Sequence, residues 1–114
     1  MDKDDNAQQA DSEKYGLLEE DLEFKRMLKQ YFIKTCGSKF AEIVSSLEEG
    51  NIEKAHRLAH TLKGNAAQLG KSFLQKAAAE VENNLKNGSN NVTQDQLKNL
   101  DMELKAVLID FNGN

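Results

Sequence analysis

The sequence predicts an all-α fold, an antiparallel four-helix bundle with an additional N-terminal helical segment. The 114 residues include no proline and only seven glycines, so long stretches contain no helix breaker. β-Branched and aromatic residues are too few for an extensive sheet. Apolar residues recur three and four positions apart in successive segments, and the short connections between these segments make neighbouring helices antiparallel.

The chain is expected to form one domain behind a polar tail. Residues 1–14 are charged and amide-rich without apolar periodicity, so we expect a flexible N-terminal tail. Residues 15–114 are expected to form the helical bundle around a single core. The tail is too polar for a secretory signal, and no apolar run approaches the roughly 20 residues that span a bilayer.

Charge and cysteine content narrow the classes of function. The net charge of −4 lacks the positive field that nucleic-acid backbones attract, so we expect neither a nucleic-acid partner nor a membrane partner. The single cysteine, Cys36, cannot form a disulfide within its own chain. A reducing, cytoplasmic setting is therefore expected. The protein is also expected to be a monomer.

The first helical pattern begins at Leu17 and continues to Leu47. A glycine at position 37, between Cys36 and Ser38, either bends this helix or breaks it, because one glycine costs a helix about 1 kcal/mol relative to alanine. The sequence leaves both alternatives open. The early apolar residues that fall on one broad side are Leu17, Leu18, Phe24, Met27, Leu28, Tyr31 and Phe32.

The clearest helix is expected over residues 52–69. It follows the turn Glu49-Gly50-Asn51, where Gly50 suits the left-handed position after a helix and Asn51 suits the N-cap of the next. Gly70 ends the helix. Its apolar seam, with the spacing of a helical bundle, consists of Ile52, Ala55, Ala59, Leu62, Ala66 and Leu69.

Two further helices are expected, each opened by a capping box and separated by a loop at residues 87–91. Ser72 with Gln75 opens the first helix, and Thr93 with Gln96 opens the second. The expected buried face of the first is Phe73, Leu74, Ala77, Ala78, Val81 and Leu85. The apolar positions of the second are Leu97, Leu100, Leu104, Val107 and Phe111.

His60 is the main candidate for chemistry. It points about 130° away from the centre of the apolar seam, so it should face water. Gly64 follows one turn later and points even further from the seam, which favours close approach of a partner over packing between helices. Arg57 and Lys63 lie one turn to either side and would stabilise an anion such as a phosphoryl group.

A metal site is another hypothesis for this helix, beside a histidine that accepts a phosphoryl group and a helical adaptor that only binds another protein. His56 and His60 have the spacing of a zinc-protease helix, but the glutamate that serves as the base in that motif is absent. Glu53 and His56 give one Glu-x-x-His pair, whereas a di-iron bundle needs a second. We therefore expect no metal site, and the sequence defines no role for His56.

The run AHTLKGNAAQLG, residues 59–70, resembles the signature of the histidine-containing phosphotransfer (HPt) family of two-component phosphorelays. The resemblance extends from about Leu17 through Leu85. It implies a four-helix bundle that passes a phosphoryl group between receiver-domain aspartates and its own histidine, without kinase activity. It also implies response-regulator receiver domains as partners and a hybrid sensor histidine kinase as a further candidate partner. No cofactor is implied, because the receiver would bring the magnesium ion.

The resemblance also assigns roles to residues. His60 would accept the phosphoryl group on Nε2, and Lys63 would balance its charge. Glu82 matches the position that hydrogen-bonds the other ring nitrogen, although periodicity alone does not distinguish it from Glu80 or Gln75. The expected docking surface for a receiver is Arg57, Gly64, Asn65, Ala67, Gln68 and Lys71. The alternative function is a non-catalytic helical adaptor that binds a receiver domain.

Overall fold

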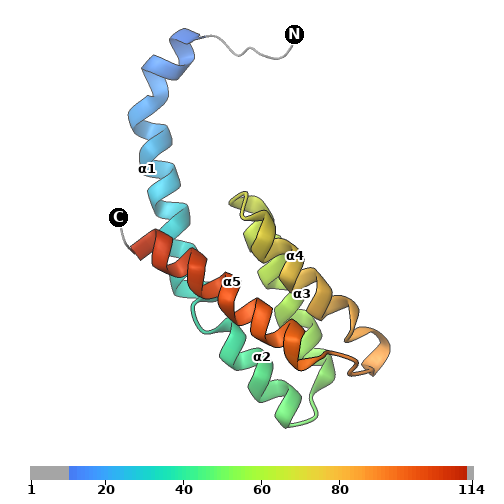
Figure 1. Ribbon diagram of the computed structural model, residues 1–114. Coiled ribbons are helices and arrows are strands. Elements are labelled where there is room, and N and C mark those ends of the chain that lie inside the picture. The colour runs from blue at the N-terminus through green and yellow to red at the C-terminus, as the bar shows by residue number, and fades with distance from the viewer. Residues whose placement is uncertain (1–10, 113–114) are drawn as a thin grey trace.

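A computed structural model describes residues 11–112, which contain helices and no strand. The elements are α1 (Asp11–Cys36), α2 (Lys39–Glu48), α3 (Ile52–Gln68), α4 (Ser72–Asn83), the short 3-10 helix η1 (Lys86–Gly88) and α5 (Gln94–Asn112). Helices α2 to α5 run alternately up and down and form the four-helix bundle (Figure 1). The last part of α1 lies beside α5 and α2, while its first part projects beyond the bundle (Figure 1). The predicted fold class is confirmed.

The first helix begins earlier than predicted, at Asp11. Residues 1–10 lie outside the described residues, whereas residues 11–14, which the sequence placed in the tail, belong to α1. At the other end, Gly37 separates α1 from α2, so the structure contains two helices and not one bent helix. A Cβ atom at Gly37 would lie 2.7 Å from the carbonyl oxygen of Ile33, which explains why glycine is required at this tight connection.

Two of the three predicted helix caps are correct. The side chain of Asn51 accepts a hydrogen bond from the Lys54 amide at 3.2 Å. Thr93 and Gln96 form a reciprocal capping box, with distances of 3.0 Å and 3.1 Å.

The predicted capping box at Ser72 and Gln75 is wrong. The N-cap of α4 is Lys71, which makes no side-chain capping bond, and its carbonyl accepts from the Gln75 amide at 2.9 Å. Gly70, with a φ of +70°, reverses the chain so tightly that Ser72 is already the first helical residue.

The core lies among α2 to α5 and the end of α1. Its buried hydrophobic residues are Phe32, Cys36, Ile43, Ala55, Ala59, Leu62, Ala66, Leu74, Ala77, Ala78, Val81, Leu85, Leu100, Leu104, Val107 and Phe111. The predicted seam of α3 supplies four of them, at positions 55, 59, 62 and 66. The small alanines of this seam let α3 and α4 pack side by side, which brings one face of each helix to a shared surface.

Two expectations about buried apolar residues are wrong. Phe73 is 76% exposed, because it lies about 100° around α4 from Leu74, which occupies the core instead. On α1, Phe24, Met27 and Tyr31 share the apolar side of the helix and yet are more than half exposed, whereas Phe32 is buried. The side chains of residues 17 and 18 lie outside the described part of the chain.

Candidate functional site

His60 stands on the solvent side of α3. Its side chain is 64% exposed, whereas Ala59 and Leu62 on the same helix are fully buried. The helix therefore fixes the backbone of His60 through its buried neighbours and leaves the imidazole accessible.

The surface beside His60 is open. Apart from the adjoining backbone of its own helix, a Cβ atom added at Gly64 would meet nothing within 4 Å, so close packing within this chain does not explain the glycine. Ala67, one further turn along, is also exposed. The main chain of α3 can thus be approached closely on the side of His60.

Glu82 of α4 holds one nitrogen of the imidazole. The Nδ1 atom of His60 donates to the Oε2 atom of Glu82 at 2.7 Å, across 22 positions in the sequence. A carboxylate only accepts hydrogen bonds, so this contact places the imidazole proton on Nδ1. In the neutral ring, Nε2 then carries a free lone pair.

The carboxylate of Glu82 is itself neutralised by a cation. The Nζ atom of Lys63 lies 2.7 Å from Oε1 of Glu82, and the Glu82 side chain is only 8% exposed. Burial alone would raise the pKa of Glu82, but the Lys63 ammonium and the His60 imidazole outweigh it and hold this pKa below its ordinary value. Glu82 is therefore kept as a carboxylate, the form that orients Nδ1–H.

His56 lies near the same carboxylate. Its Nε2 atom is 3.8 Å from Oε2 of Glu82, and its side chain is 34% exposed. Sequence reasoning assigned His56 no role, although its i, i+4 spacing from His60 indicated that both lie on one face of α3. The structure thus brings His56, His60 and Lys63 around Glu82. Among the described residues, no three His, Cys, Asp or Glu side chains are placed so that they could hold a metal ion together.

Comparison with known families supports the helical-bundle fold. The family model described as the Hpt domain matches residues 27–109. The chain belongs to the Hpt domain family. No match was found among curated proteins or among solved structures. The matched region of the Hpt domain includes the projecting helix only from residue 27 onwards and contains the whole of α2, α3 and α4.

The docking residues expected for this Hpt domain fall into two groups. Arg57, Gly64, Ala67 and Gln68 are exposed on α3. The remaining two, Asn65 and Lys71, are engaged within the chain.

Asn65 and Lys71 are tied to neighbouring helices. The Asn65 side-chain amide donates to Sγ of buried Cys36 at 3.1 Å, which links α3 to the end of α1. Lys71 pairs with Asp110 at 3.3 Å, and its Nζ lies 5.2 Å from the centre of the Phe111 ring. Both residues therefore stabilise the bundle as well as adjoin its surface.

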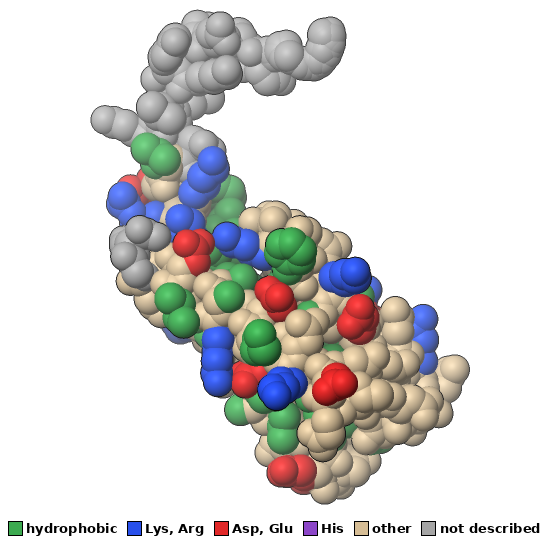
Figure 2. Space-filling view, in the orientation of Figure 1, with side chains coloured by type: hydrophobic (Ala, Val, Ile, Leu, Met, Phe, Trp, Pro, Cys, Tyr) green, Lys and Arg blue, Asp and Glu red, His purple; other side chains and the backbone are tan. Residues whose placement is uncertain are grey.

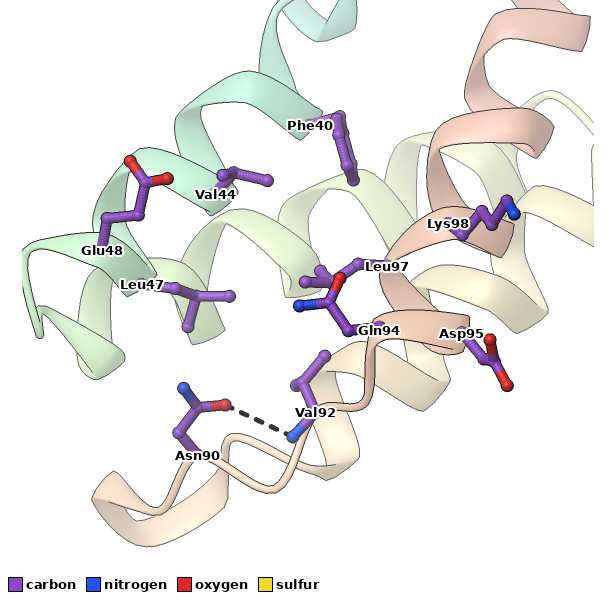
Figure 3. Close-up of a pocket in the computed structure, with 10 residues that line it drawn as sticks. All are labelled: Phe40, Val44, Leu47, Glu48, Asn90, Val92, Gln94, Asp95, Leu97 and Lys98. Atoms are coloured by element: carbon purple, nitrogen blue, oxygen red, sulfur yellow. Dashed lines mark hydrogen bonds between the residues drawn. The ribbon is translucent and has the colours of Figure 1, made fainter.

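A groove of about 760 Å³ lies away from these residues, between α2 and the beginning of α5 (Figure 3). Phe40, Val44 and Leu47 from α2 face Val92 and Leu97 across it (Figure 3). None of the predicted site residues lines this groove. No described helix of the Hpt domain is both long enough and apolar enough to cross a membrane.

Proposed function

We propose that this Hpt domain is a phosphorelay intermediate. His60 accepts a phosphoryl group from a receiver-domain aspartate and passes it to the aspartate of another receiver. The observation that carries the proposal is the 2.7 Å contact between Nδ1 of His60 and Glu82, which leaves Nε2 free on an exposed imidazole.

In the proposed transfer, one bond to phosphorus forms as another breaks, and no oxidant or reductant is needed. The Nε2 lone pair attacks phosphorus of the aspartyl phosphate, the N–P bond forms, and the P–O bond to the aspartate breaks, so that the aspartate leaves as a carboxylate. The imidazole becomes positively charged, and the Glu82 carboxylate at Nδ1–H stabilises that charge. The reverse sequence delivers the phosphoryl group to the next receiver.

Lys63 and Arg57 have different expected roles in the transfer. Lys63 already neutralises Glu82 at 2.7 Å, and its ammonium can also face the phosphoryl oxygens from one turn beyond His60. Arg57, exposed one turn before His60, would contact an acidic rim of the receiver.

The receiver supplies the remaining chemistry in this proposal. Both oxygens of Glu82 are already engaged, by Lys63 and by His60, so the magnesium ion is assigned to the receiver domain. In this role the protein transfers a phosphoryl group that it receives and has no kinase activity of its own. Each copy acts with one receiver at a time. We further propose that the protein acts in the cytoplasm and that a hybrid sensor kinase is the donor.

The test is transfer from a phosphorylated receiver domain. We expect an acid-labile, base-stable phosphate on the wild-type protein, with none on His60→Gln. His56→Gln is the matched control on the same helix face and should still be labelled. Labelling of His60→Gln at the wild-type level would show that another residue is the acceptor. A wild type that stays unlabelled across a panel of receivers that bind it would favour the adaptor function.

A further inference from the structure

Helix α5 carries a second apolar stripe opposite the one that it buries. Met102 and Ile109 are 59% and 71% exposed, and Ala106 between them is also exposed. These three positions lie within about 60° of one another and about 180° around the helix from buried Leu104. Hydrophobic side chains lie along α5 in the face seen in Figure 2, and no histidine is visible on that face.

Over residues 98–110, the charged positions that directly flank this stripe are segregated by sign. Lys98 and Lys105 follow one edge, and Glu103 and Asp110 follow the other. The pattern is that of a two-heptad coiled-coil seam. Its a positions are Asn99 and Ala106, its d positions are Met102 and Ile109, its g positions are the two lysines and its e positions are the two acids.

This arrangement matches a second α5 in parallel orientation. In a parallel pair, each g residue faces the e residue five positions later on the other helix, so Lys98 would face Glu103 and Lys105 would face Asp110 of the second copy. In an antiparallel pair, like charges would meet along both edges. A polar asparagine at one a position, here Asn99, also favours a parallel two-stranded register.

Existing ion pairs do not prevent this pairing. Lys105 lies 3.2 Å from Asp101, and Asp110 lies 3.3 Å from Lys71, all with partly exposed side chains. Such pairs contribute about 0 to 1 kcal/mol each, so a second copy can share or replace them. The charges would set the orientation, while the apolar contact would supply most of the affinity.

Phe73 extends the apolar area onto α4. Its side chain is 76% exposed and lines a groove of about 340 Å³ together with Ala106 and Glu103 of α5. The partner's lysine edge would lie against this groove, where an aromatic face attracts a cation.

We propose that the face formed by Phe73, Met102, Ala106 and Ile109 binds a second copy of this chain through parallel α5 helices. The small apolar area gives a weak dimer that forms with increasing concentration. The proposal replaces the monomer expected from the sequence. His60 lies on α3, outside this face, so both copies keep an accessible phosphoryl acceptor.

Sedimentation velocity on the full chain tests the interface. From micromolar to millimolar concentration, the wild type should shift from 12.8 kDa towards twice that mass. Ile109→Asp should remain monomeric, with unchanged helicity and unchanged labelling of His60. Leu22→Asp is the matched control, because Leu22 is 51% exposed on α1. A wild type that stays monomeric overturns the proposal, as does a dimer that Leu22→Asp dissociates and Ile109→Asp does not.

A charge exchange tests the parallel orientation. Lys98→Glu and Glu103→Lys should each weaken self-association about tenfold, because like charges then face each other at two places. An equimolar mixture of the two variants should recover the wild-type affinity. A mixture that associates no better than either variant alone contradicts the parallel pairing.

Discussion

Glu82 is the residue on which the geometry of the site depends. One of its oxygens accepts from His60 and the other pairs with Lys63, each at 2.7 Å. Periodicity alone did not distinguish Glu82 from Glu80 or Gln75, because helical spacing fixes a face of one helix and not the partner that it meets. The resemblance to the HPt family singled out Glu82, and the packing of α3 against α4 places it beside His60.

Removal of the carboxylate should change the ring tautomer of His60. In Glu82→Ala, we expect the proton to shift from Nδ1 towards Nε2, as read from ¹⁵N chemical shifts. Transfer should slow about 10- to 100-fold, because a hydrogen bond to a charged group is worth about 1.5 to 3 kcal/mol. Glu82→Gln keeps an acceptor and should lose less. An unchanged tautomer in Glu82→Ala would show that Glu82 does not orient the ring.

The lowered pKa of Glu82 predicts a pH dependence of stability. Folding favours its carboxylate form, so its contribution is complete above its ordinary pKa of 4.5 and is lost as pH falls through its lower folded pKa. Unfolding free energies of wild type and Glu82→Gln should therefore differ most above pH 4.5 and converge in acid. A difference that stays constant from neutral to acid pH would contradict this assignment.

Among the helices, α3 shows best how far a sequence pattern predicts structure. Its apolar seam, its N-cap at Asn51 and its end before Gly70 follow from local spacing and from local hydrogen bonds, and all three are found. The beginning of α4 was predicted wrongly, because the turn at Gly70 and the capping potential of Ser72 compete for the same residues. Such competition is decided by the tertiary path of the chain.

Adjacent positions on α3 should respond differently to truncation. Leu62→Ala should lower the free energy of unfolding by about 2 to 5 kcal/mol, because Leu62 is fully buried in the core. Thr61→Ala, at an exposed neighbouring position, should change it by less than about 0.5 kcal/mol. Chemical denaturation measures both, and equal losses would contradict the assignment of the two faces.

Substitutions of Gly64 should affect the stability of the protein and the rate of phosphotransfer differently. Gly64→Ala should raise the free energy of unfolding by about 1 kcal/mol, since a Cβ meets nothing within 4 Å and alanine favours the helix. Gly64→Gln should fold and yet react slowly with a phosphorylated receiver, because its side chain fills the space for docking. Labelling of the same variant by the small donor phosphoramidate should be normal. Equally fast transfer from the receiver would show that the space at Gly64 is not used.

At the scale of the whole molecule, the sequence predicted the helical bundle but not the apolar surfaces that lie outside its core. Core periodicity specifies which faces turn inward, and the resulting up-down bundle is observed. The additional N-terminal helix was predicted, but the exposure of Phe24 and Tyr31 on it and the second stripe on α5 were not, because periodicity identifies a face of one helix and not what that face contacts. Exposed apolar faces of this kind become informative only once the fold shows what they fail to contact.

The position of the phosphoryl group on the ring tests the central claim most directly. After transfer from a phosphorylated receiver to uniformly ¹⁵N-labelled protein, a ³¹P–¹⁵N correlation spectrum identifies the nitrogen that carries phosphorus. The Nδ1 contact with Glu82 predicts phosphorus on Nε2 of His60 and on no nitrogen of His56. Phosphorus on Nδ1 of His60, or on either nitrogen of His56, would contradict the account.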